Sequence, residues 1–222
     1  MIYFFPGLAT DGRLLNGYRF SEPVVVVNYP KPTPQETLEA YARRLGALYE
    51  FDDNSILIGF SLGGMIAAVI REQISVRKVI TIASLVNCDR PWWISLPLWL
   101  PLHRWLPDRV LRAIIVLLGD VFTSKSREQR QLLCDMVLKA DMDFVRWALE
   151  AVPRWAGCRY TNDIVKIHGD RDRLFPLSYA AADIVIAGGQ HFVIVQQRPA
   201  VQSHLDRLLY QRVEGISHEV SN

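Results

Sequence analysis

The sequence predicts an α/β fold in which helices cover both faces of a parallel sheet. Short runs of β-branched and aliphatic residues recur along the chain, and most are apolar at every position rather than at every second one. That pattern is typical of strands buried on both faces, as in a parallel sheet covered by helices. Helical patterns separate several of these runs, and the alternation of strand and helix indicates a doubly wound sheet.

Six runs are predicted to be strands. They are Ile2–Phe5, Val24–Asn28, Ile56–Ile58, Lys78–Ile82, Ile164–Ile167 and Ile184–Ile186. In an open parallel sheet, ligands bind outside the carboxyl ends of the strands. The residues that follow these runs are therefore the candidates for a functional site.

Three segments are predicted to be helices between or after the strands. The first begins with Thr33 as its cap, and Glu36 completes a capping box. The second is Met65–Ile74, and the last runs from about His191 to Arg212, with Pro199 breaking it in two.

Length, composition and charge fit one globular domain. The chain has 222 residues, of which 50% are hydrophobic and 22% charged, so it can bury a substantial core. The 25 basic and 23 acidic residues leave a net charge of +2. Because these charges nearly cancel, the chain as a whole lacks the positive charge that attracts nucleic acid or an anionic membrane. We therefore expect no nucleic-acid partner.

The start of the chain and its cysteines favour a cytoplasmic location. The opening run MIYFFPGL is short and has no basic residues before it, so we expect neither a signal peptide nor a membrane span there. Three cysteines lie far apart in the sequence, which is typical of reduced thiols. They are Cys88, Cys134 and Cys158.

One long segment, from about Leu85 to Trp155, breaks the alternation because it contains no clear strand. Prolines interrupt its apolar first half, which therefore lacks the ~20 continuous apolar residues of a spanning helix. We predict several short helices inserted into the α/β core. The segment also holds four of the six tryptophans: Trp92, Trp93, Trp99 and Trp105.

Ser61 is the candidate nucleophile. Residues 59–63, GFSLG, have the form G-x-S-x-G and lie between a predicted strand and a predicted helix. In that context the motif presents its serine on a sharp, strained turn at the edge of a sheet. The amino end of the following helix offers free N–H groups and a favourable dipole for a developing oxyanion.

A serine hydroxyl needs a base, and the base needs an acid to fix its tautomer. We favour His191 as the base because it follows a flexible turn after the last predicted strand, at the same sheet edge as Ser61. His168 ends a strand, which favours a structural hydrogen bond beneath the site. The remaining histidines, in the insertion, the last helix and the tail, are His103, His204 and His218.

Three aspartates remain open as the acid partner of His191. Asp170 and Asp172 follow the fifth predicted strand, within the segment 168–176, HGDRDRLFP. Asp89, after the fourth predicted strand, is the third. Aspartate is also common in turns, so position alone does not choose among them.

These motifs, in this order, resemble those of the α/β-hydrolase superfamily, and the resemblance covers most of the chain except the insertion. The sharp turn that carries the nucleophile, the nucleophile elbow, is residues 59–64, GFSLGG. The histidine motif resembles G-x-H-F, in which His191 is the histidine. The acid motif resembles H-G-x-x-D-x-x-x-P, which places Asp172 rather than Asp170 at the acid position. The resemblance also implies an oxyanion hole formed by the backbone N–H groups of Leu8 and Leu62.

The resemblance further implies a particular sheet and a lid. Family members often begin with two extra strands, whereas here the strand before the oxyanion loop starts at Ile2. We therefore expect six strands, all parallel, in the spatial order 2-1-3-4-5-6. The insertion falls where the family places its lid, so we expect a core of residues 1–84 and 156–222 and a helical lid of residues 85–155.

The implied function is that of a serine hydrolase without a metal or cofactor, which cleaves an ester or thioester of a small, largely apolar molecule through an acyl-enzyme. Two alternatives stay open: a hydrolase-like sensor or receptor, and a lyase or C–C hydrolase that uses the same triad. The apolar excess of the insertion also has three interpretations, of which we favour the first: an acyl pocket, a homodimer contact or a lipid-facing patch.

Overall fold

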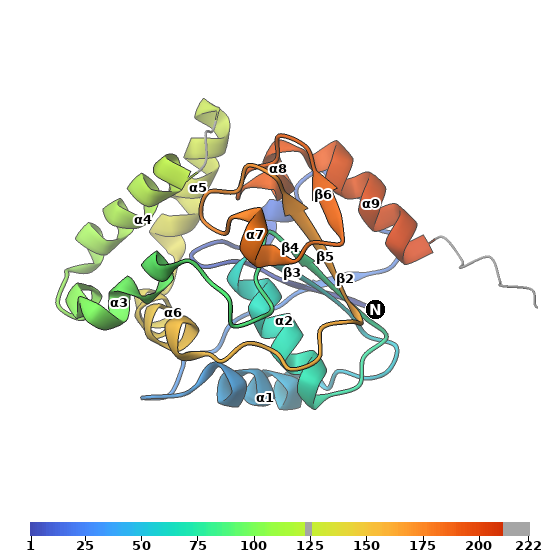
Figure 1. Ribbon diagram of the computed structural model, residues 1–222, viewed down its shortest axis with the longest axis horizontal. Coiled ribbons are helices and arrows are strands. Elements are labelled where there is room, and N and C mark those ends of the chain that lie inside the picture. The colour runs from blue at the N-terminus through green and yellow to red at the C-terminus, as the bar shows by residue number, and fades with distance from the viewer. Residues whose placement is uncertain (123–125, 211–222) are drawn as a thin grey trace, which may run out of the picture.

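The computed structural model describes residues 1–122 and 126–210 (Figure 1). In this part of the chain, six strands form one sheet in the order β2-β1-β3-β4-β5-β6, and each neighbouring pair is parallel, as predicted. The strands are β1 (Ile2–Phe5), β2 (Val24–Val26), β3 (Ile56–Phe60), β4 (Lys78–Ile82), β5 (Ile164–Gly169) and β6 (Ile184–Ile186).

Three strands have the predicted bounds, and three differ by two residues at the carboxyl end. β2 is shorter than predicted and ends at Val26. β3 and β5 are longer and continue to Phe60 and Gly169. These two strands end directly before the segments that carry Ser61 and Asp172, so both segments begin at the same edge of the sheet.

Helices connect and cover the strands. The α-helices are α1 (Leu38–Tyr49), α2 (Leu62–Gln73), α3 (Leu96–Trp99), α4 (Asp108–Phe122), α5 (Arg127–Lys139), α6 (Met142–Arg154), α7 (Leu177–Ala180), α8 (Val193–Gln196) and α9 (Arg198–Tyr210). Three short 3₁₀ helices are η1 (Gly12–Leu15), η2 (Trp92–Ser95) and η3 (Pro101–Arg104).

The predicted start of the first helix at Thr33 is wrong. α1 begins at Leu38, and the side chain of Thr37 caps it. Residues 33–36 form a turn instead, in which the Thr33 N–H donates to the Glu36 carboxylate at 2.8 Å. Gln35 has a φ of 61°, in the left-handed region, and so interrupts a right-handed helix.

The other predicted helices are present with shifted ends. α2 begins at Leu62 rather than Met65, so the helix starts immediately after Ser61. The last helix is divided as predicted, but the break lies at Gln197, and Pro199 is in the first turn of α9. Its predicted end at Arg212 lies outside the described residues.

Two apolar layers enclose the sheet. Leu57 belongs to the layer that includes α1 and α2, whereas its neighbours Ile56 and Ile58 belong to the layer that includes α8 and α9. Figure 1 shows α1 and α2 on one side of the sheet and α9 on the other. This two-sided burial explains why the strands are apolar at successive positions.

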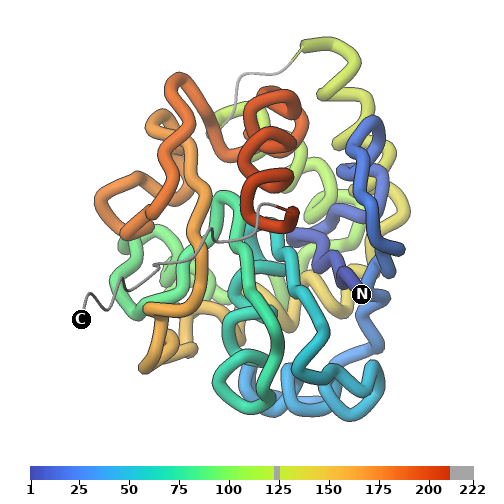
Figure 2. Tube along the Cα trace, turned by 90° about the vertical axis from the view of Figure 1, so that its right-hand side faces the viewer, coloured from blue at the N-terminus to red at the C-terminus, as the bar shows by residue number. Residues whose placement is uncertain are grey.

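The described part of the segment between β4 and β5 contains several helices and no strand, as predicted. It contains η2, α3, η3, α4, α5 and α6. α6 contributes Phe144 and Ala148 to the core layer of α1 and α2, whereas α3 and α4 lie at the outer left-hand edge in Figure 1. In Figure 2 the right-hand side of Figure 1 faces the viewer and α9 is near the front, so α9 and α4 are on opposite sides of the molecule.

Candidate active site

Ser61 lies on a strained turn between β3 and α2. Its φ and ψ are 52° and −120°, a conformation that residues other than glycine rarely adopt. The turn is tight because a Cβ on Gly63 would collide with the backbone of Phe5 and Pro6. The geometry presents the Ser61 side chain at the carboxyl edge of the sheet, as the motif predicts.

Two hydrogen bonds to the backbone of Ser61 hold this turn in place. The Ser61 N–H donates to the carbonyl of Ile82 at 3.0 Å, and the hydroxyl of Ser84 donates to the Ser61 carbonyl at 2.7 Å. Ser84 is buried in the segment after β4. Sequence analysis missed Ser84 because no motif surrounds it; its position after the neighbouring strand was the only available signal.

Three side chains form one chain of hydrogen bonds at this edge. His191 Nε2 lies 3.0 Å from Ser61 Oγ, and His191 Nδ1 lies 2.8 Å from Asp172 Oδ2. They follow three different strands, β3, β5 and β6. When the carboxylate holds the proton on Nδ1, Nε2 has a lone pair that can accept the serine proton. The arrangement can therefore activate a serine hydroxyl.

The Asp172 carboxylate is buried and fully engaged. Its Oδ1 accepts the N–H groups of Leu174 and Phe175, both at 2.9 Å. Burial alone would raise the pKa of this carboxyl, but the charge of His191 and the hydrogen bonds that the carboxyl accepts hold the pKa well below its usual range. Asp172 is therefore ionised and can stabilise a positive charge on the imidazole.

His168 stabilises the loop that follows β5 and carries Asp172, which we call the acid loop. Its Nε2 lies 2.7 Å from the carbonyl oxygen of Phe175 and 3.3 Å from Asp172 Oδ2. Because both partners are acceptors, a proton on Nε2 serves both. This buried hydrogen bond is the structural role that the position of His168 predicts.

Two glycines allow the acid loop to pack against the loop that carries His191. A Cβ on Gly169 would collide with the carbonyl of Gly189, so the two backbones pack directly against each other. The Arg171 N–H donates to the same carbonyl at 2.8 Å. This contact brings the segments of Asp172 and His191 together.

The other sequence candidates lie elsewhere. Asp170 and Asp89 are exposed. His103 is buried against Glu150 in the insertion, with His103 Nε2 3.2 Å from Glu150 Oε1. His204 is on α9 and lies beside Arg207, and His218 is outside the described residues.

The turn after β1 passes close to Ser61. A Cβ on Gly7 would lie 3.2 Å from Ser61 Cβ. Thr10 closes this turn, since its N–H and its hydroxyl both donate to the Gly7 carbonyl, at 3.2 and 3.0 Å. Within the described residues, the N–H groups of Leu8 and Leu62 donate no hydrogen bond, so both are free to bind a ligand oxygen.

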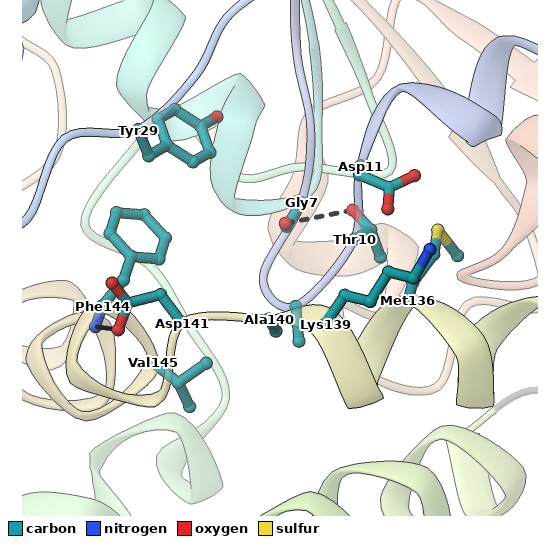
Figure 3. A pocket seen from close by; sticks show the side chains of 11 residues that line it. Gly7, Thr10, Asp11, Tyr29, Met136, Lys139, Ala140, Asp141, Phe144 and Val145 are labelled. Carbon is teal, nitrogen blue, oxygen red and sulfur yellow. Dashed lines mark hydrogen bonds between the residues drawn. The ribbon is translucent and has the colours of Figure 1, made fainter.

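A pocket of about 180 Å³ opens beside this turn (Figure 3). One side is formed by Gly7, Ala9, Thr10 and Asp11 of the turn, together with Tyr29. The other side is the junction of α5 and α6, whose apolar residues in the pocket are Met136, Ala140, Phe144 and Val145. The pocket therefore lies between the α/β core and the insertion.

The carboxylates of this pocket are already engaged. Asp11 forms an ion pair with Arg13, at 2.7 Å, and Asp141 accepts backbone N–H groups at the start of α6. The Tyr29 ring stacks on Phe144 with 4.8 Å between ring centroids, and its hydroxyl donates to the Pro6 carbonyl. Lys139 also lines the pocket, and the rest of the free lining is largely apolar.

The four tryptophans of the insertion lie outside this pocket. Trp93 donates its indole N–H to the Leu174 carbonyl in the acid loop, at 3.2 Å. Trp92, Trp99 and Trp105 are 71%, 80% and 84% exposed. The wall of the pocket is formed instead by α5, α6 and their junction, in the second half of the insertion.

In the described parts of the chain, no group of three or more His, Cys, Asp or Glu side chains could hold a metal ion. None of the described helices is long and apolar enough to cross a bilayer.

Comparisons with known proteins identify the fold. No protein-family model and no curated protein matches the sequence. The structure is similar to an esterase from Exiguobacterium antarcticum, with a TM-score of 0.69 and 15% identity over 93% of this chain and 90% of that one. A bromoperoxidase from Bacillus anthracis has a TM-score of 0.69 and 16% identity, covering 95% and 91%.

The type II thioesterase BorB from the borrelidin biosynthetic cluster is also similar. Its TM-score is 0.63 and its identity 17%, covering 93% of this chain and 91% of that chain. Each of these solved structures matches over about nine tenths or more of both chains. The chain has the α/β-hydrolase fold.

Proposed function

We propose that the protein is a serine hydrolase that cleaves a carboxylic ester or thioester of a small, largely apolar substrate. The observation that carries this proposal is the hydrogen-bonded chain from Ser61 through His191 to Asp172 at the carboxyl edge of the sheet. The similarity to esterases and a thioesterase supports the same reaction class.

Acylation is the first half of the proposed reaction. Ser61 Oγ attacks the carbonyl carbon of the substrate while its proton passes to His191 Nε2. The carbonyl oxygen becomes an oxyanion, and the C–O or C–S bond to the leaving group then breaks. The departing alcohol or thiol takes the proton from Nε2, and Ser61 is left acylated.

Water completes the reaction along the same route. It attacks the acyl carbon while giving a proton to His191 Nε2, and the second oxyanion collapses as the bond to Ser61 Oγ breaks. That proton returns to Ser61, and the carboxylic acid leaves. Throughout, Asp172 orients the imidazole and stabilises its positive charge. The scheme uses no metal or cofactor.

The N–H groups of Leu8 and Leu62 are the proposed oxyanion donors. Both are unengaged among the described residues, and they belong to the two segments that meet at Ser61. Leu62 is also the first residue of α2, where the helix dipole favours negative charge. Donors already fixed in the fold stabilise the oxyanion without reorganisation.

The pocket beside Gly7 is the proposed site for the acyl group, and residues 85–155 are the proposed lid. The free lining is largely apolar, and about 180 Å³ is below the roughly 300–1,000 Å³ of pockets for drug-sized ligands. Phe144 of α6 lines this pocket and stacks on Tyr29 of the core, a contact that supports the proposed place of the insertion beside the site.

Turnover assays with matched serine variants test the proposal. The protein should hydrolyse short p-nitrophenyl esters or acyl thioesters, with released thiol measured by a chromogenic disulfide. Ser61→Ala should lower kcat by about 10⁴-fold or more, as loss of a triad serine does. Ser203→Ala, on the exposed face of α9, is the control and should keep wild-type turnover.

The same assays separate a hydrolase from the other functions. A receptor built on this fold would bind small acyl ligands tightly but turn over neither substrate class. Comparison of oxygen and thiol esters of the same acyl group decides between an esterase and a thioesterase. The three cysteines are free thiols, which supports a cytoplasmic location for the enzyme.

A further inference from the structure

The outer helix of the insertion, α4, has a wide apolar face opposite its charged residues, and part of this apolar face is exposed to solvent. Ile115 and Val116 of α4 pack toward the core, while Leu117, Leu118 and Val121 are between 46% and 62% exposed. The apolar face of a surface helix normally packs against the core. Large exposed apolar patches mark binding surfaces.

Three exposed tryptophans precede this helix. Trp92, Trp99 and Trp105 lie in the segment of short helices before α4, and Leu100 and Leu102 beside them are each 61% exposed. Figure 1 shows α3 and α4 together at the outer edge of the molecule. We call the exposed apolar side chains of residues 92–122 the tryptophan face.

The indole N–H groups of this face lack partners. Trp93 and Trp147, which pack inward, donate theirs to backbone carbonyls. Trp92, Trp99 and Trp105 donate to no group in the described parts of the chain. A dry protein interface would have to provide acceptors for these groups, whereas the head-group region of a bilayer provides water and lipid oxygens.

The charges on this face leave an excess of positive charge. Its carboxylates, Asp108 and Asp120, form ion pairs with Arg146 and Arg130. Arg109 is exposed and has no ion-pair partner among the described residues. The near-zero net charge of the chain led us to expect no attraction to an anionic membrane. That net charge is a sum over the whole surface and does not show this local excess.

We propose that the tryptophan face docks on the surface of a bilayer that contains anionic lipids. The tryptophans and the exposed side of α4 enter the boundary between head groups and acyl chains, and Arg109 meets lipid phosphate. With 15 residues, α4 is about 22 Å long, shorter than the ~30 Å hydrocarbon core, so it lies in the plane of the surface.

Two other occupants fit less well. A second copy in a two-fold contact would bring Arg109 to a face whose carboxylates are already paired. The end of the chain is mostly polar, and α9, which leads into it, lies on the side of the molecule opposite α4. A bilayer supplies both the apolar environment and the negative charge.

Vesicle flotation of the full chain tests this proposal. We expect the protein to float with vesicles of phosphatidylcholine and phosphatidylglycerol, with a blue shift of tryptophan fluorescence. The double variant Trp99→Ser/Trp105→Ser should lower the partition coefficient at least tenfold. Tyr160→Ser, which removes an aromatic side chain of similar exposure (79%) outside the insertion, is the control and should bind like the wild type.

Charge and oligomer measurements complete the test. Arg109→Glu should lower binding to the anionic vesicles about tenfold and leave the weaker binding to pure phosphatidylcholine unchanged. Absence of flotation, or equal flotation of the double tryptophan variant, would overturn the proposal. So would a dimer in sedimentation velocity that the double variant dissociates, without vesicle binding. Ser61→Ala should bind vesicles normally, so the result is independent of the proposed hydrolysis.

Discussion

At the scale of single residues, the site depends on which of two neighbouring aspartates turns inward. Asp170 and Asp172 are two residues apart, and position along the chain could not separate them. In the structure Asp170 is exposed, whereas Asp172 is buried and 2.8 Å from His191 Nδ1. The choice results from the turn 172–175, in which the Asp172 carboxylate accepts two backbone N–H groups, a contact that only the folded loop creates.

Asp172→Asn should lower kcat by about 10⁴-fold, because the amide stabilises the wrong tautomer of His191 and no longer neutralises its charge. Asp170→Asn is the matched control and should leave kcat near the wild-type value. The measurement is steady-state turnover of the best ester or thioester at pH 7. If both variants lost activity equally, Asp172 would not be the specific partner of His191.

Asp172 should also make stability depend on acid pH. Its pKa is lower in the folded chain than the roughly 3.9 of an unfolded aspartate. Its ionised form therefore stabilises the fold above that pH, and this contribution is lost as the pH falls toward the folded-state pKa. Urea unfolding between pH 5 and pH 2 should show a shallower loss of stability for Asp172→Asn than for the wild type or Asp170→Asn. Identical slopes would contradict this prediction.

At the scale of elements, the elbow between β3 and α2 depends on close backbone contact. Local sequence predicted this element well because its motif, strand and helix are contiguous. It failed for the start of α1, where Thr33 and Glu36 match a capping box but Gln35 is left-handed and Thr37 caps the helix. The two alternatives use overlapping residues, and only the packing of α1 distinguishes them.

Gly63→Ala should destabilise the protein more than an alanine replacement at any other glycine within a helix. The new Cβ would collide with the backbone of Phe5 and Pro6, which cannot move without breaking the contact between β1 and β3. In Gly46→Ala, within α1, the new Cβ meets only the end of the Ile74 side chain. Gly46→Ala also gains up to about 1 kcal/mol of helix propensity.

Thermal unfolding measures the difference between these two variants. Gly63→Ala should lower the melting temperature by at least about 5 °C, a shift that corresponds to a few kcal/mol in a chain of this size. Gly46→Ala should remain within a few degrees of the wild type. Equal melting temperatures for the two variants would show that the elbow tolerates a side chain at Gly63.

At the scale of the whole molecule, the sheet was predictable but the pocket was not. The apolar strands predicted a parallel sheet, and the resemblance to the α/β-hydrolase superfamily implied six strands in the order found. The tryptophans of the insertion suggested an acyl pocket, yet Met136, Ala140, Phe144 and Val145 form the wall that the structure shows. Composition could not reveal which apolar residues face inward, because that depends on how α5 and α6 pack over the turn after β1.

The size of the pocket should limit the acyl chain. For short chains, kcat/KM should rise by about fourfold per added methylene, from roughly 0.8 kcal/mol each, and then fall once the pocket is full. Ala140→Leu, which fills part of the pocket, should move the optimum to shorter chains. Trp99→Ala, at an exposed position, should leave the optimum unchanged. A flat profile, or an optimum moved by Trp99→Ala alone, would contradict the assignment of this pocket.

Mapping the site of reaction with a fluorophosphonate probe tests the central claim most directly. The probe reports the activated serine without assuming a substrate, because its reaction needs the nucleophile, the base and the oxyanion donors together. Mass spectrometry of the labelled, digested protein should find one adduct, on Ser61. Ser61→Ala should remain unlabelled, Asp172→Asn should label far more slowly, and Ser203→Ala should label like the wild type. An adduct on a different serine, or no labelling of the folded protein, would contradict the account.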